Sequence, residues 1–566
     1  LAVISYGRIY FLYDIVWDDN CWLLAVYASK DIESFLNTGW FELRRVAQGM
    51  FTYYLLSLHK TSNYAYVIWH SLNIAVQIFT PVFLYLFLNK LFKEKQLLSF
   101  FAAISLIVFP LDFTLPYLTV ISYRIATLLS VVSLYFTARA FEKNGTHHHF
   151  YLMAILTSGV SYYIFMEVTV VFEVARLFII GYILSHKDIN YKLFVKRTIL
   201  FWLPFFLFCI PLIIYKLTFK PYGIYEGVYK TNFLFPLEWK EHVKMIRILL
   251  FYQWKILLEY FGEARIWTII ISILAGSAGF VALLRLSNII GKMVLQSNEI
   301  LKDVDFKERI KRICQPIAPV LLLGMLCFLP LIVLLEFAGR EIGPGFNSSH
   351  FNQLQIGYAI IIGSGLYIIY MVFNSSLFVM RLTNLSIALL IGFGVFFNNL
   401  NLDLYSNASK KQMQFWTIFA KRFPNLPKEA TILMDVRDFY YFDTPDLDNS
   451  YDLELYLNLL YAESDDPSQF RKYKALAMEE FKPEMARDSC NNLQQSVIKR
   501  ISHFGEDVLK PCEFIVVRYS NNELLVNREI VKQYPNIPYK NWADKDFPQL
   551  PQPVFYPLRH KLIGFN

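Results

Sequence analysis

The sequence of 566 residues lacks the short motifs of soluble nucleotide and nucleophile chemistry. It has no Walker A loop, no dinucleotide-binding glycine pattern and no nucleophile elbow, and its six cysteines show no zinc-site spacing. It also lacks internal repeats and low-complexity tracts. Charged residues are scarce, at 18%, whereas 55% of the residues are hydrophobic and fall in long runs. This composition argues against soluble nucleotide chemistry and predicts a polytopic α-helical membrane protein.

Eleven apolar runs have the length and composition of membrane spans. They cover approximately residues 1–16, 64–92, 97–115, 117–141, 150–166, 168–186, 197–218, 264–286, 316–338, 354–374 and 380–398. The first run is short, and the chain starts at Leu1 rather than at Met. We therefore expect a few residues before Leu1, and we do not read the first run as the remnant of a cleaved signal peptide.

Lys and Arg in the loops between these runs predict the orientation. If the N-terminus is cytoplasmic, basic residues gather in the inner loops, the largest of which runs from Arg285 to Arg312. Loops 17–63 and 219–263 and the region 399–566 then lie outside. Residues 1–398 hold 33 Lys and Arg against 23 Asp and Glu, and residues 399–566 hold 21 against 23. The basic excess therefore belongs to membrane loops and does not indicate nucleic-acid binding.

The chain divides into two predicted parts. Residues 1–398 form a transmembrane module of about 11 helices in the plasma (inner) membrane. From residue 399 the sequence turns polar, with buried strands predicted at 431–435 and 514–517 and helices at 451–461 and 470–481. We expect a small extracytoplasmic α/β domain over 399–566. Cys490 and Cys512 both fall in this domain, where a disulfide is chemically permitted, and whether they pair stays open.

Three aspartates follow the first apolar run, in the stretch Tyr-Asp-Ile-Val-Trp-Asp-Asp-Asn-Cys-Trp. Acidic residues at the border of a membrane are costly unless they serve a purpose. Asp14 and Asp18 are four apart and share a helical face, so that one face presents a base to a cavity while Asp19 or Asn20 caps the next helix. The alternative is a capped helix end at the membrane surface without chemistry.

Other polar residues extend the candidate site. The predicted topology places Arg124, Glu167 and Glu173 in the outer half of the bilayer, where an ionisable residue is a functional candidate. For Glu173, a structural ion pair with Arg176 at i,i+3 spacing is the favoured alternative. Arginine offers a planar fork suited to phosphate. The candidate phosphate-binding residues are Arg44, Arg45, Arg124 and Arg340, and the other candidate cavity residues are Asp14, Tyr123, Glu167, Glu173 and His350.

This layout resembles the GT-C superfamily of membrane glycosyltransferases. That superfamily includes protein O-mannosyltransferases, the catalytic subunits of oligosaccharyltransferases and the aminoarabinose transferase of lipid A. The shared features are an acidic pair, Asp18 and Asp19, at the start of the first outer loop, juxtamembrane helices after it, many spans and an exported C-terminal domain. Asp-Asp-Asn departs from the Asp-Xaa-Asp or Asp-Glu forms of better-known members.

The resemblance implies an inverting transfer from a polyprenyl-phosphate sugar, which reaches the site laterally through the membrane lipid. Arginines such as Arg124, Arg340 or Arg45 would hold the phosphate. Asp18, or Asp19 in its place, would act as general base on the hydroxyl of a lipid, glycan or protein acceptor. No cofactor is then required. In the alternative, Asp18 and Asp19 share a divalent cation, for which Mg²⁺ or Mn²⁺ suits oxygen ligands.

Two other functions stay open at this point. A non-catalytic membrane subunit would keep this fold as a scaffold and bind partners of a membrane complex through the C-terminal domain. A lipid or solute transporter is the third reading, and the lack of repeats or of paired Gly/Pro-broken spans in two halves speaks against it.

Overall fold

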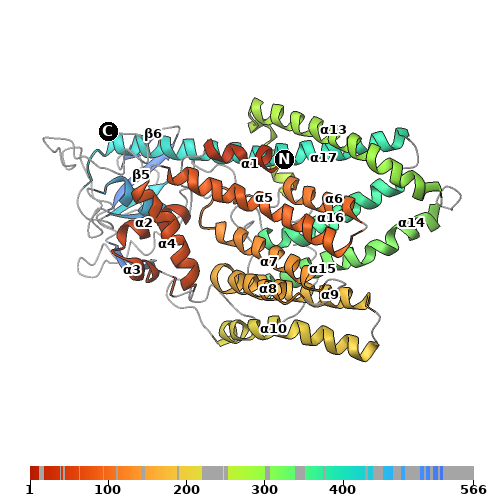
Figure 1. The fold of residues 1–566 in the computed structure, drawn as a ribbon. Coiled ribbons are helices and arrows are strands. Elements are labelled where there is room, and N and C mark those ends of the chain that lie inside the picture. The colour runs from red at the N-terminus through yellow and green to blue at the C-terminus, as the bar shows by residue number, and fades with distance from the viewer. Residues whose placement is uncertain are drawn as a thin grey trace.

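The protein is described from a computed structural model, in which the chain forms a long helical bundle with a small sheet at one end (Figure 1). The structure describes residues 1–11, 18–38, 40–41, 45–62, 64–93, 95–109, 112–141, 147–187, 190–218, 247, 253–299, 306–337, 351–373, 377–426, 431–436, 450–462, 473–478, 498–502, 505–509, 514–520 and 523–526.

Helices dominate the first three quarters of the chain. The first ones are α1 (Ala2–Tyr6), η1 (Gly7–Phe11), α2 (Asp18–Ala28), α3 (Ile32–Leu36), α4 (Val46–Thr61), α5 (Ala65–Leu91), α6 (Gln96–Val108), α7 (Ile121–Ala140), α8 (His148–Val160), the π-helical turn η2 (Ser161–Phe165), η3 (Glu167–Val171) and α9 (Phe172–Ser185). They are followed by α10 (Tyr191–Thr218), α12 (Gln253–Glu259), η6 (Phe261–Glu263), α13 (Ile266–Glu299), α14 (Phe306–Cys314), η7 (Gln315–Ile317), α15 (Ala318–Phe337), α16 (Phe351–Phe373) and α17 (Leu377–Arg422).

Within the described ranges, eight stretches are long and apolar enough to cross a membrane. They lie in α5, α7, α9, α10, α13, α15, α16 and α17. The prediction of a polytopic helical membrane protein is thereby confirmed. The other three predicted spans coincide with shorter helices, namely α1 with η1, α6, and α8 with η2.

The membrane helices differ in how deeply they sit in the bundle. In the apolar window of α7, 61% of the residues are buried, against 11% in that of α10. α7 packs against α5 and α8, whereas α10 packs mainly against α9 (Figure 1). α7 is therefore a central element and α10 a peripheral one.

At the ends of the short helices α1 and α6, backbone carbonyl groups accept hydrogen bonds from asparagine side chains of α17. The Asn398 amide donates to the carbonyl of Ile107 at 3.0 Å, near the end of α6. The Asn399 amide donates to the carbonyls of Ile4 and Ser5 at 3.2 Å, at the end of α1. Backbone groups at a helix end lack partners within the helix, and lipid cannot supply them. The asparagines of α17 therefore satisfy carbonyl groups at the ends of these two helices.

Glycines on α16 let neighbouring helices approach closely. A methyl group at Gly363 would lie 2.4 Å from the backbone nitrogen of Ala102 in α6, and one at Gly357 would lie 2.6 Å from the carbonyl oxygen of Gly324 in α15. Both distances are below van der Waals contact, so only glycine fits at these positions. Small residues of this kind are typical of helix interfaces in membranes.

The helix α17 joins the membrane layer to the sheet. It runs without interruption through 46 residues, so the predicted boundary at residue 399 falls inside it. Beyond it, β1 (Thr431–Asp435), β2 (Lys474–Ala477), β5 (Ile515–Ser520) and β6 (Glu523–Val526) form a sheet in the order β2-β1-β5-β6. β1 pairs in parallel with β2 and β5, and β6 is antiparallel to β5. β3 (Ile498–Ser502) and β4 (Gly505–Leu509) form a separate antiparallel pair.

The sequence predictions for this sheet region had mixed outcomes. The strand at 431–435 and the helix at 451–461 are confirmed as β1 and α18 (Ser450–Leu460), and the strand at 514–517 lies within β5 apart from its first residue. The predicted helix at 470–481 is wrong for the residues described there. Residues 474–477 form β2, because pairing with β1 buries the run Ala-Leu-Ala in the sheet and outweighs its helix propensity.

Helices α2 and α4 share one hydrophobic core with the sheet. Trp22 and Tyr27 of α2 and Leu56 of α4 belong to the same buried cluster as Trp416 of α17 and Tyr456 of α18. The rings of Trp416 and Tyr456 stack with centroids 4.8 Å apart and planes inclined by 8°. Helices α2 and α4, which fall in the predicted loop 17–63, thus pack against the C-terminal strands, and α4 extends from this core toward the membrane helices (Figure 1).

Candidate functional site

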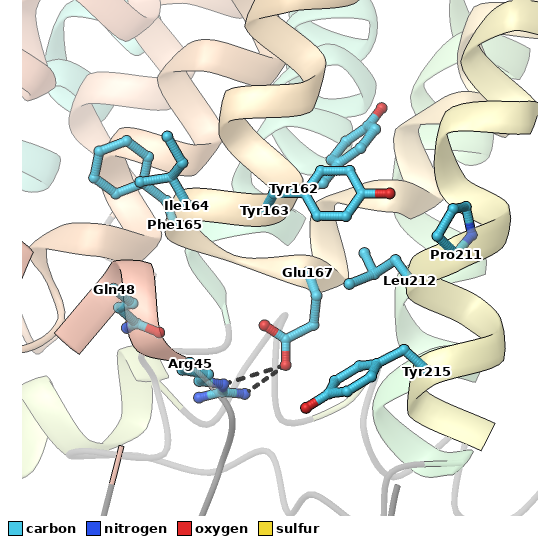
Figure 2. A pocket seen from close by; sticks show the side chains of 10 residues that line it. All are labelled: Arg45, Gln48, Tyr162, Tyr163, Ile164, Phe165, Glu167, Pro211, Leu212 and Tyr215. Carbon is cyan, nitrogen blue, oxygen red and sulfur yellow. Dashed lines mark hydrogen bonds and ion pairs between the residues drawn. The ribbon is translucent and has the colours of Figure 1, made fainter. Parts of the chain in front are cut away.

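A cavity of about 350 Å³ lies where the start of α4, the π-helical turn η2 and the end of α10 meet (Figure 2). Three polar side chains line it together with aromatic and apolar ones. The lining residues are Arg45, Gln48, Tyr162, Tyr163, Ile164, Phe165, Glu167, Pro211, Leu212 and Tyr215. Its volume lies at the lower end of the range of ligand pockets, about 300–1,000 Å³. The cavity therefore offers an amphipathic space of the size of a small headgroup.

Arg45 and Glu167 form an ion pair in the wall of this cavity. Nη2 of Arg45 lies 2.8 Å from Oε1 of Glu167, and Nε donates to the same oxygen at 3.2 Å. Arg45 is the residue before α4, and Glu167 opens η3 directly after the π-helical turn. The side chains are 14% and 15% exposed, so both are largely withdrawn from solvent and still reach the cavity. Figure 2 shows the carboxylate of Glu167 pointing toward Arg45.

The π-helical turn η2 turns two adjacent tyrosines to different partners. The backbone N–H of Met166 donates to the carbonyl of Ser161 at 2.8 Å and closes the wide turn. The Tyr162 hydroxyl then donates to the carboxylate of Glu173, and the Tyr163 hydroxyl donates to the carbonyl of Phe208 in α10 at 2.5 Å. π-Helical turns of this kind are frequent at functional sites. Here the turn brings both rings to the cavity wall.

Glu173 and Arg176 form a buried ion pair behind the cavity. Nε of Arg176 lies 2.8 Å from Oε2 of Glu173. Arg176 also donates to the hydroxyl of Thr137 and, at 2.8 Å, to that of Ser133, both on α7. The pair has the geometry of the structural alternative that the sequence favoured. Its only connection to the cavity among the described contacts is the Tyr162 hydroxyl.

Arg124 is also held in a buried network and does not line the cavity. Its Nε lies 2.8 Å from Oδ2 of Asp112, and it donates to Asn73 and Thr114 at 3.1 Å each. The side chain is 2% exposed. Tyr123, its neighbour in sequence, packs at the edge of an apolar cluster around Tyr6 and Ile74. Arg124 thereby binds Asp112 and Thr114, which lie between α6 and α7 in the chain.

Asp19 binds backbone rather than facing a cavity. Its Oδ2 accepts the N–H of Leu118 at 2.7 Å, and its Oδ1 accepts that of Thr119 at 2.8 Å, just before α7. It is 1% exposed. Burial raises the pKa of this carboxyl to about 6, against the two backbone hydrogen bonds, which lower it. Asp19 therefore has a structural position, and it supports α7 rather than the start of its own helix.

The acidic stretch and the cavity meet on one segment of chain. The Gln48 side chain, which lines the cavity, donates to the hydroxyl of Ser122 at 2.8 Å. Asp19 holds the backbone three residues earlier, at Thr119. The starts of α2 and α4 thus both bind residues 119–122, at the beginning of α7.

Several predicted residues lie outside the described parts of the chain. These are Asp14, Arg44, Arg340, His350, Cys490 and Cys512, together with the side chain of Asp18. Of the predicted residues that are described, Arg45 and Glu167 come together at the cavity, whereas Asp19, Arg124 and Glu173 belong to three separate buried networks. In the described part of the chain, no three His, Cys, Asp or Glu side chains gather as a metal site.

A further buried cluster centres on Asp403, which the sequence analysis did not single out. This fully buried carboxylate pairs with Arg8 of η1 and, at 3.4 Å, with Arg265 at the start of α13. The Thr268 hydroxyl donates to it as well. Arg8 interrupts the first apolar run, and an isolated charge in such a run is a signal. Its partner lies 395 positions away, which no local pattern reveals.

Comparisons of this chain with protein-family models, with curated proteins and with solved structures find no match.

Proposed function

We propose that this protein is an inverting membrane glycosyltransferase of the GT-C type. It moves a sugar from a polyprenyl-phosphate donor to a lipid, glycan or protein acceptor outside the cytoplasm. The observation that carries the proposal is the Arg45–Glu167 pair in the wall of an amphipathic cavity. A guanidinium and a carboxylate side by side are the two groups that such a transfer needs, one for the leaving phosphate and one for the acceptor proton.

Arg45 is the phosphate-binding residue of this proposal. In the structure its Nε and Nη2 both point at one carboxylate oxygen of Glu167. A guanidinium fork binds phosphate in the same manner as carboxylate. The phosphate of the donor would take the place of Glu167 on Arg45, and the carboxylate would be released toward the acceptor.

Glu167 would then act as general base. It removes the proton of the acceptor hydroxyl while the oxygen attacks the anomeric carbon from the face opposite the phosphate. The bond between that carbon and the phosphate oxygen breaks, and its electron pair leaves with the polyprenyl phosphate held by Arg45. A positioned base contributes about 10²–10⁴-fold to such a step.

The aromatic and apolar part of the cavity suits a lipid-linked donor. Tyr163, Leu212 and Tyr215 line it from η2 and α10. α10 lies at the periphery of the bundle, so the cavity is close to the surrounding lipid. A donor with an anionic headgroup and an apolar chain matches Arg45 on one side of the cavity and these aromatic and apolar residues on the other.

The proposed orientation places this cavity on the outer side, with about 11 spans and the C-terminal strands outside. It is supported by the distribution of charge along the bundle. Lys187 follows α9, Lys192 and Lys196 begin α10, and α14 carries further basic residues, at the end of the bundle opposite the sheet (Figure 1). Basic residues of this kind favour the cytoplasmic side.

The proposal uses Arg45 rather than a metal ion to balance the charge of the phosphate. A divalent cation shared by Asp18 and Asp19 is the alternative. Both carboxylate oxygens of Asp19 accept backbone N–H groups, which supports the metal-free form.

A glycan profile of cells that lack the gene and carry a variant copy tests this proposal. Surface glycolipids and glycoproteins are measured by mass spectrometry for wild type, Glu167→Gln, Arg45→Lys and Asp18→Asn at matched protein levels. Glu259→Gln is the control, because Glu259 forms an exposed ion pair with Lys255 on α12. We expect Glu167→Gln and Arg45→Lys to remove one specific sugar and the control to retain it.

Other outcomes change the assignment in defined ways. If only Asp18→Asn removes the sugar, the base is Asp18 and the role given to Glu167 is wrong. If deletion of the gene leaves every glycan intact, the glycosyltransferase proposal fails and a scaffold role takes its place.

A further inference from the structure

The short helix α14 carries an unusual density of positive charge. Its nine residues read Phe-Lys-Glu-Arg-Ile-Lys-Arg-Ile-Cys, with four basic residues and one acidic residue. Ile310 and Ile313 are three apart and therefore share one face of the helix. The helix is thus amphipathic, with its basic residues grouped within six positions.

The apolar face of α14 is anchored in the bundle. Ile313 is 7% exposed and belongs to the same buried cluster as Ala102 of α6 and Val372 of α16, and Ile310 packs against that cluster. The helix also contacts α16. Lys311 and Arg312, which lie between these two isoleucines in the sequence, are exposed.

The exposed cations lie at the border of an apolar span. The apolar stretch Ile310–Leu334 begins within α14, so Lys311 and Arg312 fall in its first turn. A further cation, Lys95, lies beside the last turns of α16, which also hold Val372. Its Nζ is 5.8 Å from the ring centre of Tyr367. Long basic side chains at such a border reach the headgroup layer of the bilayer.

We infer that α14 is a binding site for the headgroups of anionic phospholipids. Four or more basic residues on an amphipathic helix beside a span are the pattern that attracts an anionic leaflet. Lys311 and Arg312 lie at the start of an apolar stretch, so a phosphate group that binds them there belongs to a lipid rather than to a soluble molecule. The site lies at the opposite end of the bundle from the sheet and is independent of the proposed transferase activity (Figure 1).

The test is a titration of the purified full chain with phosphatidylglycerol or phosphatidylcholine in mixed micelles, followed by native mass spectrometry. The site variant is Lys311→Gln with Arg312→Gln. The matched control is Lys421→Gln with Arg422→Gln, an exposed Lys-Arg pair in the last turn of α17. We expect the wild type to prefer phosphatidylglycerol, the site variant to bind it about 30-fold more weakly, as two surface charges predict, and the control to bind like the wild type.

Further measurements distinguish an effect of charge from an effect on folding, and a lipid site from a site for free phosphate. The exchange Lys311→Arg with Arg312→Lys keeps both charges and should retain binding. Raising the salt concentration should weaken binding to the wild type, a result that does not depend on any variant folding. The inference is overturned if the site variant binds phosphatidylglycerol like the wild type, or if the control variant loses this binding to the same extent. It is also overturned if the charge-preserving exchange abolishes binding or if salt has no effect on it. Displacement of the lipid by glycerol phosphate would show a site for free phosphate and would overturn the inference as well.

Discussion

The guanidinium of Arg176 lies over the ring of Phe205, with Cζ 4.1 Å from the ring centre. Arg176 belongs to α9 and Phe205 to α10, and both are buried. One turn earlier in α10, the indole N–H of Trp202 donates to the carbonyl of Glu173 at 3.0 Å. Since α10 has few other buried residues, these contacts hold the helix whose end forms one wall of the cavity.

Loss of the Phe205 ring should loosen α10. We expect Phe205→Ala to expose Cys209, which lies one turn further along α10 and is 1% exposed, to a membrane-permeant maleimide. Removal of a buried Phe costs about 3–5 kcal/mol, enough to shift a local equilibrium. Labelling of Cys209 is followed by mass spectrometry. Phe206→Ala is the control because Phe206 is 37% exposed, and equal labelling in both variants would contradict the anchoring role.

Neutralising Glu167 should have opposite effects on binding and on catalysis. In the proposed site, Glu167 competes with the donor phosphate for Arg45. We therefore expect Glu167→Gln to bind polyprenyl phosphate more tightly than the wild type while transferring sugar about 10²–10⁴-fold more slowly. Calorimetric titration and a transfer assay measure the two effects. Weaker binding of polyprenyl phosphate to the variant would show that no such exchange takes place.

Asp19 should make the stability of the protein depend on pH. Its folded-state pKa of about 6 exceeds the ordinary value for Asp, so the folded state binds the proton more tightly than the unfolded state between these values. The contribution of Asp19 therefore falls as the pH rises from about 4 to 6. We expect the difference in unfolding temperature between wild type and Asp19→Asn, measured in detergent, to be larger at pH 4 than at pH 7. A constant difference would mean that Asp19 does not titrate in this range.

The buried pair of Arg124 and Asp112 should be essential for folding. Asp112→Asn leaves a guanidinium that is 2% exposed without its counter-charge, and such losses cost about 3–5 kcal/mol. The combined change Asp112→Leu and Arg124→Met removes both charges and should recover much of the loss. Thermal unfolding in detergent measures both variants. Glu259→Gln, at the exposed pair with Lys255, should change stability by about 1 kcal/mol or less.

The sequence predicts the parts of this fold that depend on local pattern. Long apolar runs coincide with the membrane helices, and the buried run Thr431–Asp435 is a strand with the predicted bounds. Pro110 and Gly7 are local signals for the ends of α6 and α1. The hydrogen bonds from Asn398 and Asn399 at these ends have no local signal, because they come from hundreds of residues away. β2 was mistaken for a helix because its residues suit a helix and only pairing with β1 makes them a strand.

The candidate site was predictable in its residue types and not in their grouping. Arg45 and Glu167 were both predicted, as a phosphate ligand and a cavity residue, but their contact joins positions 122 apart. Glu173 and Arg176 lie within one helical turn of each other, so their pairing could be read from the sequence. Asp19 and Arg124 look alike in sequence as charges near a membrane, and only packing decides that both are buried in hydrogen-bond networks.

The uninterrupted course of α17 limits how the two ends of the molecule can move. A helix of 46 residues is about 69 Å long and resists stretching, because each turn is closed by its own hydrogen bonds. Its first half packs on α13 and its last turns lie in the core beside the sheet. The distance between the membrane layer and the strands is therefore fixed. A change in the tilt of α17 in the bilayer would move the sheet sideways, parallel to the membrane surface.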